Sequence, residues 1–293
     1  MTGLAIYSPV EQIFDPLFSE KKVEVFVKRD DMIHPFISGN KWRKLKYILS
    51  YAETQNKKHL VTFGGVFSNH LLAIACAAAK FGFRSTGIVR GEEVHNDVLM
   101  LCKLFGMNLQ FTDRSSYRDK PALYKTHFAA DSDAIFIDEG GAGEPGVRGC
   151  SELLSELQEN YDHIFCAAGT GTTAAGIVRG VKEHSLASIV QVVPVLKDGG
   201  FLKTEIERYT DQPFSIHPDY HFGGYAKTTP ELLTFIQTFC KSTGILIEPV
   251  YTGKMFFALY DLIKKDNLPA GSRILAVHTG GLTGILGMSS KLK

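Results

Sequence analysis

HLVTFGGVFSNHLLAIACAAAKF is the stretch at residues 59–81 of this chain. Its first part, His59 to Phe63, is a short apolar run of the kind that forms a buried strand. Two glycines follow, and the run from Asn69 to Phe81, rich in Leu and Ala, has the length and composition of a helix. A strand, a glycine turn and a helix in this order predict one βαβ unit of a mainly parallel sheet.

The same pattern recurs along the chain. Further short apolar runs predict strands at Ser85 to Val89, Asn108 to Phe111, Ala134 to Ile137, His163 to Ala167, Ile189 to Val193 and Arg273 to His278. We therefore expect an α/β protein of two domains, each a mainly parallel twisted sheet flanked by helices. The strongest glycine and proline break, residues 139–146, predicts a crossing between domains. We expect a small domain of residues 45–144 inserted in a large one of residues 1–44 and 145–293.

Charge and cysteine content narrow the class of partner. The chain has 32 Lys and Arg against 31 Asp and Glu, a net charge of +1, which is too even for a nucleic-acid footprint. Small molecules are therefore the expected partners. The five cysteines are widely spaced and form no CxxC pair, so free thiols in a reducing compartment are expected, and no metal site.

The sequence shows no feature typical of secretion or membrane insertion. The residues after Met1 do not form a basic segment followed by an apolar one, and no eighteen apolar residues run uninterrupted. We expect a cytoplasmic protein without a membrane partner.

Lys41 lies in the run SGNKWRK at residues 38–44, which reads as the start of a helix. Lys41, Arg43 and Lys44 place three cations where the helix dipole disfavours positive charge, so an anion is expected nearby. Lys41 and Lys44 are three residues apart and share one helix face. Lys41 can therefore bond a cofactor aldehyde as a Schiff base, while Lys44 pairs with a phosphate of the same molecule.

A second glycine turn, Gly169-Thr170-Gly171-Thr172-Thr173, lies between a predicted strand and a predicted helix. Free backbone N–H groups at a helix start, together with threonine hydroxyls, form a site for an anion. A dinucleotide site also follows a strand, but Gly176 is not at the fingerprint spacing and no acidic residue follows Pro194. A Walker loop is excluded because no Gly-Lys-Ser/Thr follows. A simple phosphate site is the better interpretation.

Ser68, Asn69 and His70 likewise stand between a strand and a helix. Their N–H groups and side chains can hold a substrate carboxylate, although Ser68 can also be a plain helix N-cap. The glycines at positions 64 and 65 favour close approach of a ligand. Because ligands bind at the carboxyl ends of parallel strands, we expect these glycine turns to share one crevice.

These motifs resemble those of a known family. The chain is similar to the pyridoxal-phosphate enzymes of the tryptophan-synthase β-like fold (fold type II), and within them to 1-aminocyclopropane-1-carboxylate deaminases and D-cysteine desulfhydrases. The resemblance covers most of the chain, and its motifs lie at residues 27–31, 38–45, 64–69, 106–109, 140–141, 171–176, 248–254 and 278–281. The lysine motif and the Pro-Val-Tyr-x-Gly-Lys motif together are specific to the group.

The resemblance implies how pyridoxal 5'-phosphate is held in the cleft between the domains. Lys41 would carry it as a Schiff base, and Lys44 with the turn from Gly169 to Thr173 would bind its phosphate. Asn69 would contact the ring hydroxyl.

The resemblance also implies the residues that meet the substrate. Ser68, Asn69 and His70 would bind the substrate carboxylate, and Ser68 matches the serine proposed as the nucleophile in cyclopropane opening. Tyr225 and Tyr251 match the two active-site tyrosines of the group. For both tyrosines an ordinary core position stays open as an alternative.

Thr252 and Thr279 decide which reaction of the group is expected. Cyclopropane deaminases have glutamate and leucine at these positions, whereas desulfhydrases match this chain. A carboxylate beside the pyridine nitrogen keeps that nitrogen protonated and makes the ring a strong electron sink, whereas a hydroxyl leaves it largely neutral. A weaker sink still suffices for β-elimination, in which the leaving group takes the electrons.

We therefore expect a pyridoxal-phosphate-dependent lyase that converts a small, D-cysteine-like amino acid to a 2-oxo acid and ammonia. The resemblance implies a homodimer. Deamination of 1-aminocyclopropane-1-carboxylate to 2-oxobutanoate and ammonia is the alternative. A dinucleotide-dependent oxidoreductase and a non-catalytic ligand-binding module stay open as different classes.

Overall fold

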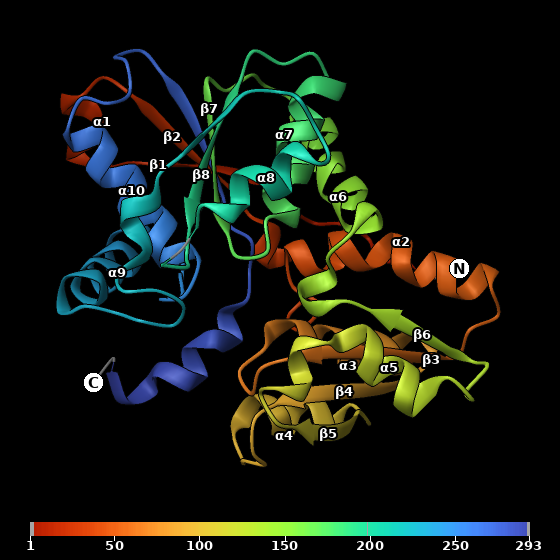
Figure 1. Ribbon diagram of the computed structural model, residues 1–293. Helices are drawn as coiled ribbons and strands as arrows, with labels where there is room; N and C mark the ends of the chain where they lie inside the picture. Colours follow the sequence, from red (N-terminus) through yellow and green to blue (C-terminus); the bar gives the residue numbers. More distant parts are fainter. Residues whose placement is uncertain (1–2, 198, 292–293) are drawn as a thin grey trace.

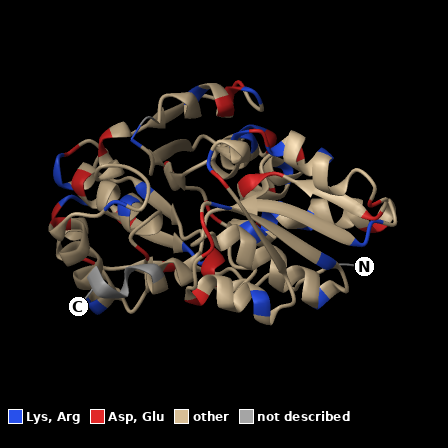
Figure 2. Cartoon of the chain, turned by 60° about the horizontal axis from the view of Figure 1, so that its bottom comes forward, with Lys and Arg blue, Asp and Glu red and all other residues tan. Residues whose placement is uncertain are grey.

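The computed structural model describes residues 3–197 and 199–291, with side chains described through residue 286. The chain forms two β-sheets covered by helices, and helix α2 (Asn40–Thr54) runs between them (Figure 1). Basic and acidic residues are interspersed around both sheets (Figure 2). Among the described helices, none is long and apolar enough to cross a bilayer.

The larger sheet has six strands in the order β1-β2-β10-β7-β8-β9. Only the β1–β2 pair is antiparallel, and the other neighbours run parallel. The strands are β1 (Val10–Ile13), β2 (Glu24–Lys28), β7 (His163–Ala168), β8 (Ile189–Pro194), β9 (Phe214–Ile216) and β10 (Arg273–Val277).

Helices cover both faces of this sheet. One face packs on α1 (Pro16–Glu20), α9 (Pro230–Thr243) and α10 (Thr252–Lys264), and the other on α6 (Glu144–Ser151), α7 (Thr172–Glu183) and α8 (Phe201–Glu207). Because both faces are covered, the inner strands are mostly apolar and are buried along most of their length. Strand β7, for example, is buried at every residue.

The smaller sheet has four parallel strands in the order β5-β4-β3-β6. The strands are β3 (His59–Gly64), β4 (Arg84–Arg90), β5 (Asn108–Thr112) and β6 (Ala134–Ile137). One face packs on α2, α3 (Asn69–Phe81) and α4 (Asp97–Leu104), and the other on α5 (Lys120–Phe128).

The predicted fold class is confirmed, since each of the two sheets is mainly parallel and flanked by helices. All seven predicted strands are present, whereas β1, β2 and β9 were not among them. The predicted boundary between residues 44 and 45 falls inside the continuous helix α2. The division into an inserted domain of residues 45–144 and a larger one stays a prediction.

Glycine-containing turns follow the carboxyl ends of β3, β7 and β10. The turn after β10 meets the start of α3, because a Cβ atom on Gly281 would lie 2.8 Å from Asn69 Nδ2. Thr283 Oγ1 also donates a hydrogen bond to Asn69 Oδ1 at 2.8 Å. The carboxyl edges of the two sheets therefore face each other, and this edge is where ligands bind in parallel sheets.

Candidate active site

Lys41 lies in the first turn of α2, and the close approach that Gly39 allows fixes the position of this turn. Gly39, the N-cap, has φ +56°, and a Cβ atom there would lie 2.0 Å from the carbonyl oxygen of Thr279. Asn40 N donates to the same oxygen at 3.2 Å. Only glycine permits this approach, so the start of α2 is held against the turn that follows β10.

The amine of Lys41 has no hydrogen bond or ion pair with the described residues, and its side chain is partly buried. Burial, followed by repulsion from Lys44, lowers the pKa of Lys41 to about 7. A lysine with this pKa is about half in the free-amine form at neutral pH, and that is the form that attacks a carbonyl carbon or accepts a proton.

Lys44 is buried one helical turn further on, with only 3% of its surface exposed. Its Nζ donates to the carbonyl of Gly140 at 3.1 Å, within the turn η3 (Glu139–Gly141). An ammonium group has three donors, so two remain without a partner in the described part of the chain. A buried cation with unused donors fits an anionic ligand.

Glycines surround Lys44 on two sides. A Cβ atom on Gly141 would lie 3.3 Å from Lys44 Cβ, and one on Gly146 would lie 2.4 Å from the carbonyl of Gly141. The site therefore forms only because Gly141 and Gly146 let this segment come close to α2.

The start of α7 lies beside the start of α2, since Asn40 Nδ2 donates to Thr173 Oγ1 at 2.9 Å. Gly171, the N-cap, has φ +87° and no side chain caps the helix. The Thr170 and Thr172 hydroxyls are 3.2 Å apart. The first N–H groups of α7 are therefore left for a ligand, and the positive end of the helix dipole favours an anion there.

The turn before α7 also contacts Tyr251, one of the two predicted active-site tyrosines. A Cβ atom on Gly169 would lie 3.2 Å from Tyr251 Cε1. The predicted phosphate turn and the Pro-Val-Tyr segment are thus in direct contact.

Ser68 is the N-cap of α3, because its hydroxyl accepts a hydrogen bond from Leu71 N at 3.3 Å. A Cβ atom on Gly64 would lie 2.7 Å from Ser68 Oγ, which explains the glycine at this position. The capping interpretation of Ser68 therefore holds. Its proposed contact with a substrate is an additional role, compatible with the cap because the side chain stays partly exposed.

His70 is buried beside Lys44, since a Cβ atom on Gly141 would lie 3.5 Å from both His70 Cε1 and Lys44 Cδ. Thr62 Oγ1 donates to the carbonyl of Ile137 at 3.0 Å, so it accepts the hydrogen bond from His70 Nε2 at 2.8 Å. The buried Nδ1 has no hydrogen-bond partner among the described residues. Burial and then the nearby lysines hold the pKa of His70 well below its ordinary value, so the ring is neutral.

Tyr225 and Tyr251 contact each other. Their hydroxyl oxygens are 3.4 Å apart and their ring centroids 5.9 Å apart in an edge-to-face arrangement. Tyr225 is 47% exposed, and it joins the other predicted residues through Tyr251. Tyr225 is therefore not a core residue, whereas Tyr251 is partly buried and packs against the core of the larger sheet, so the core alternative stays open for Tyr251.

Thr252 is fully buried at the start of α10, and its hydroxyl is engaged by Glu248. Thr252 Oγ1 accepts a hydrogen bond from Glu248 N at 3.0 Å and donates to Glu248 Oε1 at 3.3 Å. The motif 248–254 was noted in the sequence, but no role was predicted for Glu248. The sequence signal that could have identified Glu248 is a carboxylate inside the apolar run Ile247-Glu248-Pro249-Val250.

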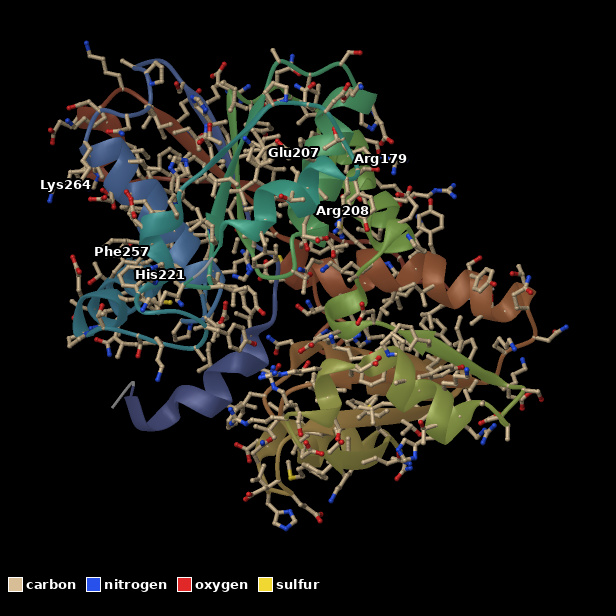
Figure 3. The ribbon with its side chains drawn as sticks, in the orientation of Figure 1. Arg179, Glu207, Arg208, His221, Phe257 and Lys264 are labelled. Atoms are coloured by element: carbon tan, nitrogen blue, oxygen red, sulfur yellow. The ribbon has the colours of Figure 1, made fainter. Side chains whose placement is uncertain are left out.

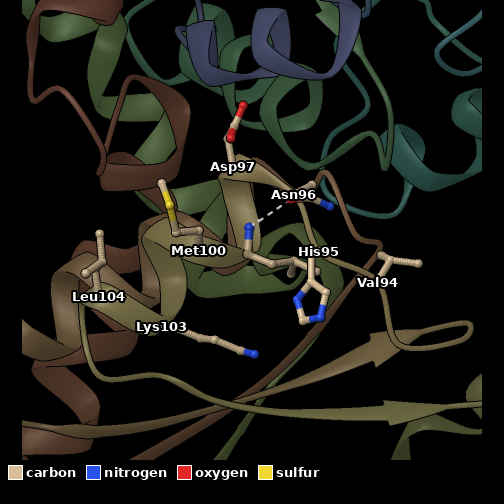
Figure 4. A pocket seen from close by; sticks show the side chains of 8 residues that line it. Val94, His95, Asn96, Asp97, Met100, Lys103 and Leu104 are labelled. Atoms are coloured by element: carbon tan, nitrogen blue, oxygen red, sulfur yellow. Dashed lines mark hydrogen bonds between the residues drawn. The ribbon is translucent and has the colours of Figure 1, made fainter.

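A separate surface pocket of about 580 Å³ lies at the start of α4 (Figure 4). It is lined by Val94, His95, Asn96, Asp97, Leu99, Met100, Lys103 and Leu104. None of the predicted site residues lines it. Asn96 Nδ2 donates a hydrogen bond to the carbonyl of Val66 at 3.0 Å. Asn96 therefore links the start of α4 to the turn that precedes Ser68.

Two features describe the ligand that this site fits. A free amine of lowered pKa fits a carbonyl group, and a buried ammonium beside an uncapped helix start fits a phosphate or similar anion. Pyridoxal phosphate carries both groups.

Comparison with known proteins agrees with this geometry. The family model of pyridoxal-phosphate dependent enzymes matches residues 13–280. A Pyrococcus abyssi protein provisionally assigned as a 1-aminocyclopropane-1-carboxylate deaminase is 34% identical over 289 residues, which cover 91% of this chain and 87% of that protein. The bifunctional D-cysteine desulfhydrase/1-aminocyclopropane-1-carboxylate deaminase of Arabidopsis thaliana is 30% identical over 294 residues, 89% of this chain and 73% of that protein.

The fold agrees as well. The crystal structure of a 1-aminocyclopropane-1-carboxylate deaminase homologue superposes with a TM-score of 0.89 at 28% identity, covering 99% of this chain and 94% of the other. The dinucleotide-dependent oxidoreductase and the non-catalytic module are therefore set aside. The chain belongs to the pyridoxal-phosphate-dependent enzymes of fold type II, in the group of 1-aminocyclopropane-1-carboxylate deaminases and D-cysteine desulfhydrases.

Proposed function

We propose that this enzyme deaminates a small amino acid with a β-leaving group, with D-cysteine as the model substrate. D-Cysteine and water would give pyruvate, hydrogen sulfide and ammonia. The observation that carries the proposal is the hydroxyl at Thr252, where a cyclopropane deaminase has a carboxylate. The Thr252 hydroxyl is neutral and hydrogen-bonds to Glu248, so the side chain at position 252 adds no negative charge of its own.

The residues of the site fit the cofactor as follows. Lys41 would form the covalent link to its aldehyde, and Lys44 with residues 169–173 would bind its phosphate. Asn69 would meet the ring hydroxyl, and Thr252 and Thr279 would lie at the ring nitrogen. When bound, pyridoxal phosphate supplies an electron sink for bonds at the substrate Cα atom.

The chain's own groups then divide the remaining work. The N–H groups and side chains of Ser68, Asn69 and His70 would bind and orient the substrate carboxylate at the start of α3. Lys41, released as a free amine when the substrate amine takes its place, would accept the Cα proton. The Tyr225 and Tyr251 rings would cover the β-substituent and limit access of water.

Cyclopropane-carboxylate deamination is the second candidate, and the relatives favour it. The Arabidopsis relative is named for both activities, and other relatives are named for the cyclopropane substrate alone. Ser68 stands at the α3 start in either case. The two candidates differ in how strong an electron sink the cofactor ring must be. Thr252 and Thr279 would make the ring a weaker sink than a carboxylate would.

The deciding experiment compares release of 2-oxo acid from D-cysteine, L-cysteine and 1-aminocyclopropane-1-carboxylate by the purified holoenzyme. We expect kcat/KM for D-cysteine to exceed that for the cyclopropane by roughly tenfold or more, which corresponds to about 1.4 kcal/mol of transition-state stabilisation. Faster release of 2-oxobutanoate from the cyclopropane would reject the proposal in favour of the second candidate.

The pKa of Lys41 gives a pH dependence for cofactor attachment. Because the free amine attacks the aldehyde and the pKa of Lys41 is about 7, attachment to cofactor-free protein should speed up as pH rises through 7 and level off about one pH unit above it. The measurement is the rate of borohydride-trapped adduct at a series of pH values. A rate that still climbs near the ordinary lysine pKa of 10.5 would contradict a lowered pKa.

We further propose a homodimer located in the cytoplasm. Support comes from the resemblance to the group and from the five cysteines, which are all free and mostly buried. Light scattering coupled to size exclusion would test the dimer.

A further inference from the structure

Two charged side chains of opposite sign are wholly buried at the start of α10. Glu248 and Lys254 each have 0% of their surface exposed. No ion pair joins them in the part of the chain that the structure describes. Burying unpaired charges costs several kcal/mol, so each charge needs strong partners elsewhere.

The partners of Glu248 are backbone N–H groups. Its carboxylate accepts hydrogen bonds from Val250 N and Tyr251 N, both at 2.7 Å, and from Thr252 N at 2.8 Å. These are donors that the start of α10 would otherwise leave without partners. The carboxylate therefore fixes the backbone of the segment that carries Tyr251.

The partners of Lys254 are backbone carbonyls of a different segment. Its Nζ donates to Gly224 O at 2.7 Å, to His221 O at 2.8 Å and to Val195 O at 3.4 Å. All three donors of the ammonium group are thereby directed at carbonyls. Two of these carbonyls belong to the loop that carries Tyr225, which we call the tyrosine loop (residues 221–226).

The tyrosine loop has a backbone that needs support. Phe222 and Ala226 have φ of +52° and +56°, in the left-handed region that non-glycine residues rarely adopt, and Gly223 and Gly224 have φ of +89° and +116°. Such conformations cost about 1–3 kcal/mol each for residues with a Cβ atom and persist only when the surroundings hold them.

The tyrosine loop packs directly on α10. The ring of Phe222 meets that of Phe257, a residue of this helix, edge-on at 4.9 Å. Charge-assisted bonds to the ammonium group of Lys254 add to this packing and offset the unfavourable backbone.

The two charges thus act on two tyrosines that touch each other. We propose that Glu248 and Lys254 are positioning residues: the carboxylate holds Tyr251, the ammonium holds the loop of Tyr225, and together they set the gap through which the substrate's β-substituent enters. The role of that gap and the kinetic readout rest on the proposed function, whereas the positioning of the two tyrosines does not.

The electrostatics of the pair agree with that geometry. Burial lowers the pKa of Lys254 to about 8, and attraction from Glu248 opposes the shift. Burial raises the pKa of Glu248, and the N–H donors at residues 250–252 oppose that shift.

The test is hydrogen–deuterium exchange on the holoenzyme with Lys254→Met, which keeps the length of the side chain and removes the charge. We expect exchange of amides in residues 221–226 to rise by about tenfold or more, while residues 250–253 change little. Glu248→Gln should show the reverse pattern. The matched control is Lys264→Met, the same change at an exposed position on α10, and it should alter neither segment.

A kinetic arm uses whichever amino acid the substrate panel shows to be turned over. Lys254→Met should raise KM by about tenfold with a smaller change in kcat and an unchanged cofactor spectrum, because the covering tyrosine is misplaced while the lysine site is intact. Lys254→Arg, which keeps the charge, should recover part of the loss.

Unchanged exchange in residues 221–226 of Lys254→Met would overturn the proposal, and so would equal changes in both segments. If Lys254→Met does not fold, Lys254→Gln is compared with Lys254→Arg instead. Equal exchange of residues 221–226 in these two variants would also overturn the proposal. The exchange arm needs no substrate. A negative substrate panel would therefore reject the proposed function and the role of the gap, but not the inference that Glu248 and Lys254 position the two tyrosines.

Discussion

Replacing Lys41 with alanine is expected to abolish covalent attachment of pyridoxal phosphate and to lower 2-oxo acid release by roughly 10³-fold or more. The loss combines two roles, because the same amine would bond the cofactor and accept the Cα proton. It is also the one amine of the site without a hydrogen bond or ion pair in the described residues, and its pKa is lowered to about 7. The measurement is borohydride reduction followed by peptide mass spectrometry.

The matched control is Lys46→Ala on the same helix. Lys46 is partly exposed and forms an ion pair with Glu152 at 2.6 Å, so its loss should cost less than about 1 kcal/mol of stability and leave attachment unchanged. If borohydride still fixed the cofactor to a different lysine of Lys41→Ala, the assignment of Lys41 would be wrong.

Lys41 lies at a helix start, as the sequence predicts, because its neighbours carry local signals, whereas its role as the Schiff-base residue stays a prediction. A strand, a glycine turn and a helix start can each be read within a dozen residues, and parallel topology brings such turns to one edge. The contacts between Asn40 and Thr173, and between Gly39 and Thr279, are the outcome.

Other features depend on contacts that no local pattern encodes. Strands β1 and β9 are short sheet edges, and β2 ends in Lys28, a charged residue that is 2% exposed because Glu156 pairs with it. A lysine at a strand end predicts exposure, so the pattern misleads here. The roles of Glu248 and Lys254 are hidden for the same reason, since their partners are backbone atoms of other segments.

Arg43→Met is expected to destabilise the fold by about 3–5 kcal/mol, the cost of leaving a buried charge without its partner. Arg43 and Asp30 are 2% and 1% exposed, and the guanidinium bonds both carboxylate oxygens of Asp30 at 2.6 and 2.7 Å. The same guanidinium bonds Glu156 at 2.8 and 2.9 Å. The measurement is urea unfolding of the cofactor-free protein, read as the free energy of unfolding.

The position of Arg43 makes this prediction relevant to the active site. Arg43 lies two residues after Lys41 and one before Lys44, and a Cβ atom on Gly149 of α6 would lie 1.8 Å from the carbonyl of Arg43. Helix α2 is thus held between the carboxylates of Asp30 and Glu156 on one side and α6 on the other. Losing this anchor should also weaken cofactor binding, because both lysines move with the helix.

A double-mutant cycle separates the buried pair from general damage. Asp30→Asn combined with Arg43→Met should be less destabilising than the sum of the single changes, by about 1–3 kcal/mol, because the unpaired charge is removed as well. The control is Arg179→Met on α7 (Figure 3), whose ion pairs with Glu144 and Glu183 lie at the surface and should contribute about 1 kcal/mol or less. Equal losses for Arg43→Met and Arg179→Met would show that the buried network does not anchor α2, and that the placement of Lys41 depends on the apolar packing of the helix instead.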